Sequence, residues 1–83
     1  GVPTYEIDSS ALQDDISIID LLATHTNIYS SKGEARRALK SNAVSINQEK
    51  VNEEYRVSKE DIITNGYILV RKGKKDYHLV QVV

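Results

Sequence analysis

Ser31–Val51, SKGEARRALKSNAVSINQEKV, is the stretch from which the organisation of the whole chain is predicted. At 100° per residue, Ala35, Ala38 and Leu39 fall on one face of a helix. The opposite face follows the i, i+3, i+4, i+7 spacing and is polar and basic: Gly33, Arg36, Arg37 and Lys40, with Lys32 close by. The pattern predicts a helix that packs by one side and presents cations on the other.

The same stretch carries signals for both ends of this helix and for a hairpin after it. Ser31 is a strong N-cap, and Glu34 at the third helical position completes a capping box. Asn42 is placed to close the helix, because asparagine tolerates a left-handed backbone. Residues 44–46 alternate as a strand, residues 47–49 form a turn, and residues 50–51 return.

The rest of the chain supplies a second helix and a second hairpin. A helix is expected from Ser17 to about His25, and Val57 and residues 62–63 are expected in the core. Residues 67–70 and 77–82 predict strands joined by a basic turn over residues 71–75. We therefore predict a small α+β domain: two main helices packed on a short mixed or antiparallel sheet of about four or five strands.

The composition limits the number of domains and the kinds of disulfide, metal and membrane-spanning feature that the chain can form. Eighty-three residues make one small domain, and 40% hydrophobic residues suffice for a core. The absence of cysteine excludes disulfides and cysteine-based zinc sites. No apolar run approaches the roughly 20 residues that span a bilayer, so no membrane partner is expected.

The N-terminal residues have two interpretations. Residues 1–13 read as a lead-in from a missing N-terminal part, with the domain proper over residues 14–83. Tyr5 and Ile7 also alternate with polar neighbours, so residues 4–7 could instead be a strand. Because the chain starts at Gly1 and not at Met, we expect it to be a fragment of a longer protein.

The net charge of −1 hides segregated blocks of charge. Residues 1–20 carry five acidic and no basic residues, whereas residues 21–50 carry five basic and two acidic ones. Residues 51–61 are again acidic, with four acids and two bases, and residues 62–83 carry four bases and one acid. Such segregation can produce a local positive field on a nearly neutral protein.

Catalysis within these residues is not expected. His25 and His78 lack metal-ligand spacing, and no nucleophile is tied to a base. Asp14 and Asp15 suit a helix dipole better than acid–base chemistry. No Ser or Thr follows Lys74, so Gly73-Lys74 does not form a phosphate-binding loop. We predict no catalytic residue and no metal or cofactor site in this chain.

Binding to a polyanion is the better supported hypothesis. One basic cluster is Lys32, Arg36, Arg37 and Lys40, and the other is Arg71, Lys72, Lys74 and Lys75. Arginine can hold phosphate bidentately, which lysine cannot. Tyr29, Tyr67 and Tyr77 could stack bases, but a chain without Phe or Trp lacks a dense aromatic platform. The sequence therefore favours folded RNA, recognised by its shape and phosphates.

Ser31–Val51 resembles the S-four-like (alpha-L) RNA-binding domain. That family runs helix, Ser-basic-x-x-Ala-Arg-x-x-Ile/Leu-basic, a small residue, then Val-x-Val/Ile-Asn-Gly-x-x-Val, and the match covers about residues 16–60. Gly66–Val80, GYILVRKGKKDYHLV, is similar to the closing hairpin of the C-terminal domain of bacterial tyrosyl-tRNA synthetases. The Gly-Val-Pro opening is similar to the junction in those enzymes.

The resemblance implies a function for the chain and for a parent protein. The parent would be a cytoplasmic class I tyrosine–tRNA ligase, a homodimer through a missing catalytic domain that uses ATP with magnesium. This chain would be a monomeric domain without a cofactor that holds the tyrosine-specific tRNA near its variable arm and anticodon stem. By position, the RNA-binding residues would be Ser31, Lys32, Arg36, Arg37, Lys40, Lys50, Arg71, Lys72, Lys74 and Lys75.

Two residues of this chain depart from the sequence pattern of the family. Asn42 and Gln48 stand where the family usually has glycine, which puts backbone contact with RNA there in doubt.

The chain could instead be an S-four-like domain of an rRNA pseudouridine synthase or of a ribosome-associated heat-shock protein. A DNA-binding helix-turn-helix module and a protein-interaction domain are further alternatives. Lys32, Gly33 and Glu34 are poor major-groove readers for a recognition helix.

Overall fold

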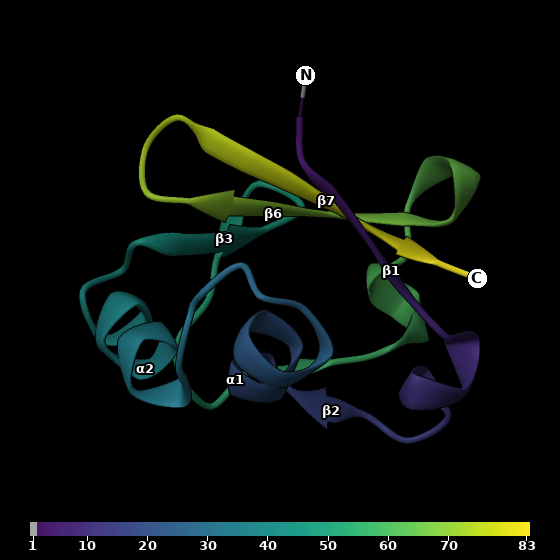
Figure 1. Cartoon of the computed structure of the whole chain (residues 1–83), viewed down its shortest axis with the longest axis horizontal. Helices are drawn as coiled ribbons and strands as arrows, with labels where there is room; N and C mark the ends of the chain where they lie inside the picture. The colour runs from purple at the N-terminus through teal and green to yellow at the C-terminus, as the bar shows by residue number, and fades with distance from the viewer. Residues whose placement is uncertain (1) are drawn as a thin grey trace.

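A five-stranded mixed sheet forms one layer of the domain (Figure 1). The computed structural model describes residues 2–83. The strand order is β1-β7-β6-β3-β4, in which only the β1–β7 pair is parallel. The strands are β1 (Thr4–Ile7), β3 (Val44–Ile46), β4 (Glu49–Lys50), β6 (Tyr67–Lys72) and β7 (Asp76–Val82). The predicted fold class is confirmed.

The helices lie on one side of this sheet (Figure 1). The first begins as α1 (Ile18–Asp20) and continues as a π-helical turn, η2 (Leu21–His25). The Ser17 hydroxyl accepts a hydrogen bond from the Ile19 amide at 3.2 Å and caps the helix. Thr26 ends it, because its hydroxyl donates to the Leu21 carbonyl at 2.8 Å. The second helix is α2 (Lys32–Lys40), as the sequence predicts.

Short elements close the side of the domain away from α2. The strands β2 (Ile16–Ser17) and β5 (Arg56–Val57) form a separate antiparallel pair, which the sequence did not predict. Single turns of 3-10 helix are η1 (Ser9–Leu12), η3 (Lys59–Asp61) and η4 (Thr64–Gly66). Val57 is fully buried in the core, as expected.

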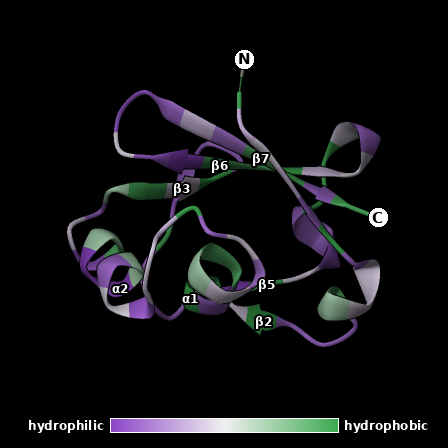
Figure 2. Cartoon of the chain, in the orientation of Figure 1, coloured by the Kyte–Doolittle hydropathy of each residue, from purple (hydrophilic) through white to green (hydrophobic). Residues whose placement is uncertain are grey.

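The core lies between the sheet and the helices (Figure 2). Alternation along β6 and β7 turns Ile68, Val70 and Val80 towards the helices, where each is fully buried. From α2, Ala35 and Leu39 complete this layer, so the apolar face predicted for that helix is confirmed. Residues 62–63 were expected to re-enter the core, and for Ile63 this is wrong. Its side chain is 44% exposed, because the residue lies at an isolated bridge to Tyr67 just before η4.

The N-terminal residues are part of the same folded unit. Thr4–Ile7 forms an edge strand beside β7, with Ile7 opposite Val82, so the strand interpretation of residues 4–7 is confirmed. Ile7 and Leu12 are both buried in the core. The segment expected to be a lead-in thus packs with the domain that was expected to begin at residue 14.

Two turns use non-glycine residues with a left-handed backbone. Asn42 follows α2 with φ 59°, which closes the helix as predicted. Asn47 and Gln48 have φ 51° and 73° and form the tight turn between β3 and β4. The Asn47 side chain fixes this turn, because its amide donates to the Asp61 carbonyl at 2.7 Å and accepts from the Leu69 amide at 3.0 Å.

Candidate nucleic-acid interface

Helix α2 presents most of the first basic cluster to solvent. The Ser31 hydroxyl accepts a hydrogen bond from the Glu34 amide at 3.1 Å, which is the predicted N-cap. The Glu34 carboxylate, however, accepts from the Ser30 hydroxyl at 2.8 Å, so only half of the predicted capping box forms. With Ala35 and Leu39 buried, the basic side chains of this helix are directed away from the core.

Two of these cations have acidic neighbours. The Lys32 ammonium is 3.3 Å from the Asp20 carboxylate, and the Arg36 Nε is 4.0 Å from the Glu53 carboxylate. Both pairs are largely exposed, and exposed ion pairs contribute little to stability. A phosphate group could therefore replace either carboxylate at small cost.

Arg37 and Lys40 are exposed in the last turns of α2, and no acidic side chain of residues 2–83 lies within 4.0 Å of their charged groups. Cations near a helix C-terminus also interact favourably with the helix dipole. The Arg37 guanidinium lies beside Gly33, where an added Cβ would be 3.7 Å from a terminal nitrogen. That distance is an ordinary contact, so packing within the chain does not require glycine at position 33.

The second cluster divides into two kinds of side chain. The Lys72 ammonium donates to the Ile28 carbonyl at 3.0 Å and lies 4.6 Å from the centroid of the Tyr29 ring. Arg71 donates from a terminal nitrogen to the Ser45 hydroxyl at 3.2 Å. Lys72 is therefore held by the fold, and the RNA contact expected of it from the sequence stays a prediction. Tyr29, buried beneath it, is not available for stacking.

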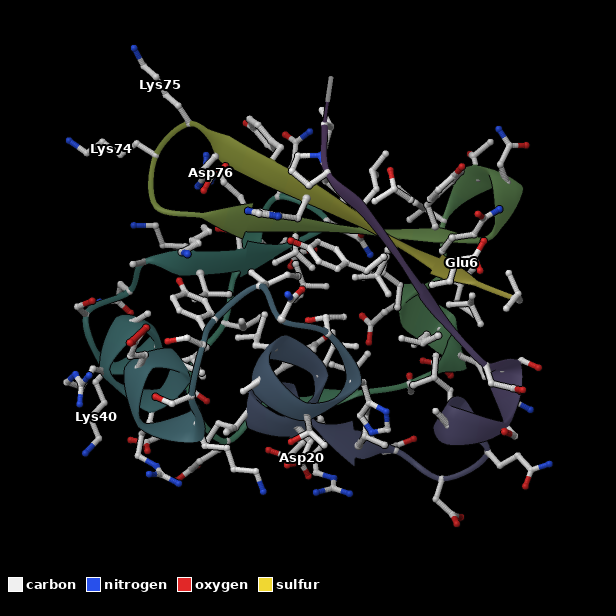
Figure 3. The ribbon with its side chains drawn as sticks, viewed as in Figure 1. Glu6, Asp20, Lys40, Lys74, Lys75 and Asp76 are labelled. Atoms are coloured by element: carbon white, nitrogen blue, oxygen red, sulfur yellow. The ribbon has the colours of Figure 1, made fainter. Side chains whose placement is uncertain are left out.

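The side chains of Lys74 and Lys75 extend into solvent at the tip of the β6–β7 hairpin (Figure 3). The Gly73 amide donates to the Ala43 carbonyl at 2.6 Å, which joins the tip to the loop that follows α2. Lys40 lies on the same side of the molecule as these two lysines in Figure 3. The Gly73–Ala43 hydrogen bond thus joins the hairpin that carries Lys74 and Lys75 to the loop that follows Lys40 and α2.

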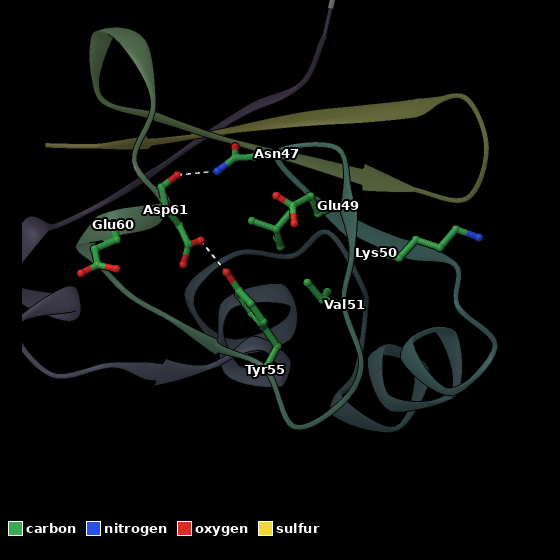
Figure 4. A pocket seen from close by; sticks show the side chains of 8 residues that line it. Asn47, Glu49, Lys50, Val51, Tyr55, Glu60 and Asp61 are labelled. Atoms are coloured by element: carbon green, nitrogen blue, oxygen red, sulfur yellow. Dashed lines mark hydrogen bonds between the residues drawn. The ribbon is translucent and has the colours of Figure 1, made fainter.

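Lys50 is among the residues that line an acidic cavity, and its side chain points away from Tyr55 and Asp61 (Figure 4). The cavity, of about 250 Å³, lies between the β3–β4 hairpin and η3. Within it the Tyr55 hydroxyl donates to the Asp61 carboxylate at 2.5 Å. Burial of the phenol, followed by this hydrogen bond and the nearby carboxylates, raises the pKa of Tyr55 to about 12. The contact ties η3 to the loop before β5, and Lys50 is exposed on the adjoining strand β4.

Of the two histidines considered from the sequence, His78 lies in the core, and residues 2–83 contain no group of side chains that could hold a metal ion. His78 is buried, with Nδ1 3.2 Å from the Tyr5 hydroxyl and Nε2 3.3 Å from the Asp76 carboxylate, which agrees with a structural role. Within residues 2–83 no group of three or more His, Cys, Asp or Glu side chains could hold a metal ion. Over the same residues no helix has the length and apolar character needed to cross a membrane.

Sequence reasoning missed the groups that restrain the basic side chains. Asp20 and Glu53 pair with Lys32 and Arg36 from other elements, and Ser45 holds Arg71 from the neighbouring strand. Each partner lies at least 12 positions away in the sequence. Ser45 lies opposite Arg71 because β3 pairs with β6, and no local sequence pattern predicts that pairing.

Comparison with known proteins identifies the family. Residues 1–80 match the model of the tyrosine–tRNA ligase SYY-like C-terminal domain. The chain is 45% identical over 81 residues to a tyrosine–tRNA ligase of Porphyromonas gingivalis, covering 96% of this chain and 19% of that protein. It is 40% identical over 83 residues to a tyrosine–tRNA ligase of Flavobacterium johnsoniae, covering 100% of this chain and 19% of that protein.

The chain therefore belongs to the tyrosine–tRNA ligase C-terminal domain family, which confirms the resemblance found in its hairpin and basic helix. It spans about a fifth of the length of the curated relatives that it matches. These matches favour this family over the pseudouridine synthase, heat-shock protein and helix-turn-helix alternatives.

Proposed function

We propose that this member of the tyrosine–tRNA ligase C-terminal domain family binds the tyrosine-specific tRNA through the edge of the domain where α2 meets the β6–β7 hairpin. One observation supports the proposal most strongly. Arg37, Lys40, Lys74 and Lys75 are exposed, have no acidic partner within 4.0 Å in residues 2–83, and come from two segments joined by the Gly73–Ala43 hydrogen bond.

The chemistry of these side chains suits phosphate. Arg37 offers a planar guanidinium that can bind two phosphate oxygens at once, and the three lysines act as mobile point charges. Lys32 and Arg36 extend the surface, because their exposed carboxylate partners can be exchanged for phosphate. Lys50 and Arg71 add cations on the open face of the sheet. Ser31 uses its hydroxyl to cap α2, so its contribution is to orient the helix.

Proposals about the parent protein follow from the family. We propose that the parent attaches tyrosine to tRNA using ATP with magnesium, in a catalytic domain outside this chain. This domain would hold the variable arm and anticodon-stem region while the reaction takes place elsewhere. We further propose that the parent is a cytoplasmic homodimer whose dimer contacts lie outside these 83 residues.

A panel of variants tests the binding surface. The 83-residue chain is titrated into a fluorescently labelled transcript of a bacterial tyrosine-specific tRNA that carries a long variable arm. Arg37→Ala with Lys40→Ala should weaken binding more than tenfold, since each lost hydrogen bond to a charged group is worth about 1.5–3 kcal/mol. Lys59→Ala, which removes an exposed lysine from η3 among acidic residues, should bind within twofold of the wild type.

The stability of the variants separates binding from folding. Arg36→Ala with Arg37→Ala should leave the melting temperature nearly unchanged, because both side chains are exposed and the Arg36–Glu53 pair is long. Unchanged affinity for the Arg37/Lys40 variant, or an equal loss for Lys59→Ala, would contradict the proposed surface.

A further inference from the structure

The face of the sheet that the helices leave open is unusually rich in large side chains. Antiparallel sheets with one face in water normally alternate apolar-in with polar-out residues. Here the open face of β6 and β7 carries Tyr67, Leu69, Tyr77 and Leu79, all of them partly exposed. In Figure 1 the labelled helices all lie on the other side. A face that contacts only solvent would not be expected to carry so many large apolar and aromatic side chains.

One row of residues crosses four strands of this face. Ser45 on β3 is opposite Lys50 on β4 and Arg71 on β6, and Arg71 is in turn opposite Tyr77 on β7. Strands lie about 4.8 Å apart, so the row runs roughly 14 Å from Lys50 to Tyr77. Residues directly opposite one another point to the same face, with Cβ atoms about 5 Å apart.

Arg71 is fixed within this row. A terminal nitrogen of its guanidinium donates to the Ser45 hydroxyl at 3.2 Å, and Ser45 is almost fully buried beneath it. The Arg71 Nε is also buried, and no hydrogen-bond acceptor within residues 2–83 reaches it. The guanidinium is therefore held over Ser45, and the sheet register sets Arg71 directly opposite Tyr77.

The charge on this face is suited to a nucleotide. Lys50 and Arg71 lie in the row, and Lys74 and Lys75 follow at the nearby hairpin tip. The acidic residue on the open face of the strands is Glu6, which lies opposite Gln81, four positions from Tyr77 along β7. Asp76 points to the other face, where its carboxylate is 3.3 Å from His78.

We propose that the row Lys50–Ser45–Arg71–Tyr77 holds one unpaired nucleotide of the bound RNA. The base stacks on the Tyr77 ring, and its phosphate contacts Arg71 and Lys50. Aromatic rings and guanidinium planes are common supports for unstacked RNA bases. This inference rests on the proposed function, because the nucleotide belongs to the tRNA that α2 binds.

A pair of matched variants at Tyr77 tests the stacking. Tyr77→Leu keeps an apolar side chain but removes the ring, and should weaken binding to the labelled tRNA transcript about five- to tenfold. Tyr77→Phe keeps the ring and should bind within twofold of the wild type. The dependence of affinity on salt should have the same slope in all three proteins, since stacking releases no counterions.

A wild-type measurement covers the case in which Tyr77→Leu fails to fold. Hexa-adenylate, a single strand without base pairs, is added to the isotopically labelled chain, and backbone amide shifts are followed by NMR. Shifts concentrated at residues 45, 50, 71 and 77 are expected. Their absence at saturating oligonucleotide would overturn the proposal.

The outcomes distinguish this inference from the function on which it rests. If the wild type shows no salt-dependent binding to the tRNA, the proposed function fails and this inference fails with it. If the Arg37/Lys40 variant loses affinity while folded Tyr77→Leu does not, only the nucleotide site is overturned. The basic edge would then remain the proposed RNA contact, without a nucleotide site on the open face.

Discussion

Replacing Lys72 by methionine should destabilise the domain, although the sequence places this lysine in a basic turn. Its ammonium donates to the carbonyl of the buried Ile28 at 3.0 Å and lies 4.6 Å from the Tyr29 ring centroid. A hydrogen bond to a charged group is worth about 1.5–3 kcal/mol, and a cation–π contact about 0.5–2 kcal/mol. The hydrogen bond and the cation–π contact share one ammonium, so their energies are not additive. We therefore expect the free energy of unfolding to fall by about 2 kcal/mol.

Urea denaturation followed by far-UV circular dichroism measures this loss, with a matched control in the same hairpin. For a domain of this size, about 2 kcal/mol corresponds to a fall in melting temperature of roughly 8–16 °C. Lys74→Met removes an exposed lysine two residues away and should change stability by no more than about 0.5 kcal/mol. The difference should persist at 0.5 M KCl, since partly buried contacts are weakly screened. Equal stability of the two variants would refute the structural role of Lys72.

Three further predictions concern stability. Leu39→Ala should cost about 2–5 kcal/mol in chemical denaturation, because the leucine is 1% exposed in the core; a loss below 1 kcal/mol would contradict that packing. Gln48→Gly should raise the melting temperature by a few degrees, because Gln48 has φ 73° and left-handed backbone costs non-glycine residues about 1–2 kcal/mol; a lower melting temperature would argue against that turn. The raised pKa of Tyr55 favours its neutral form in the folded state, so its contribution is complete below pH 10 and is lost as the pH rises towards 12. The melting-temperature advantage of the wild type over Tyr55→Phe should therefore shrink between pH 9 and pH 12, whereas a constant difference would show that the Tyr55–Asp61 contact does not control this pKa.

Local patterns predicted much of the fold. The spacing of Ala35 and Leu39 predicted which side of α2 is buried, and Ser31 predicted where that helix begins. Asn42 as the closing residue of α2 was likewise predicted from residue type and position. A turn was predicted over residues 47–49, whereas it consists of Asn47 and Gln48, and Glu49 already belongs to β4. These features depend on the periodicity and capping of neighbouring residues, which the sequence displays directly.

Features that depend on distant partners could not be predicted in this way. Lys72 and Lys74 belong to one basic run, yet Lys72 contacts a loop 44 positions away and Lys74 contacts solvent. The alternation of a strand indicates two faces but does not identify which elements cover each one. The same reason explains Ile63, whose apolar side chain suggested burial and which is 44% exposed.

The candidate site was predicted in part. The exposed cations of α2 were chosen correctly as a solvent-facing group, whereas the acidic partners of Lys32 and Arg36 were not foreseen. Tyr67 and Tyr77 were named as possible stacking residues, but only the sheet register places Tyr77 beside Arg71. RNA contact by each of these residues stays a prediction.

The salt dependence of tRNA binding reports how many of the exposed cations neutralise a phosphate. Affinity of the chain for the tyrosine-specific transcript is measured from 50 to 200 mM KCl. If Arg36, Arg37, Lys40, Lys74 and Lys75 each neutralise a phosphate, log affinity should fall against log salt with a slope of about −4. The Arg37→Ala, Lys40→Ala variant should reduce the steepness by about 2. A flat response in the wild type, or an unchanged slope in the variant, would contradict an RNA-binding surface built on α2.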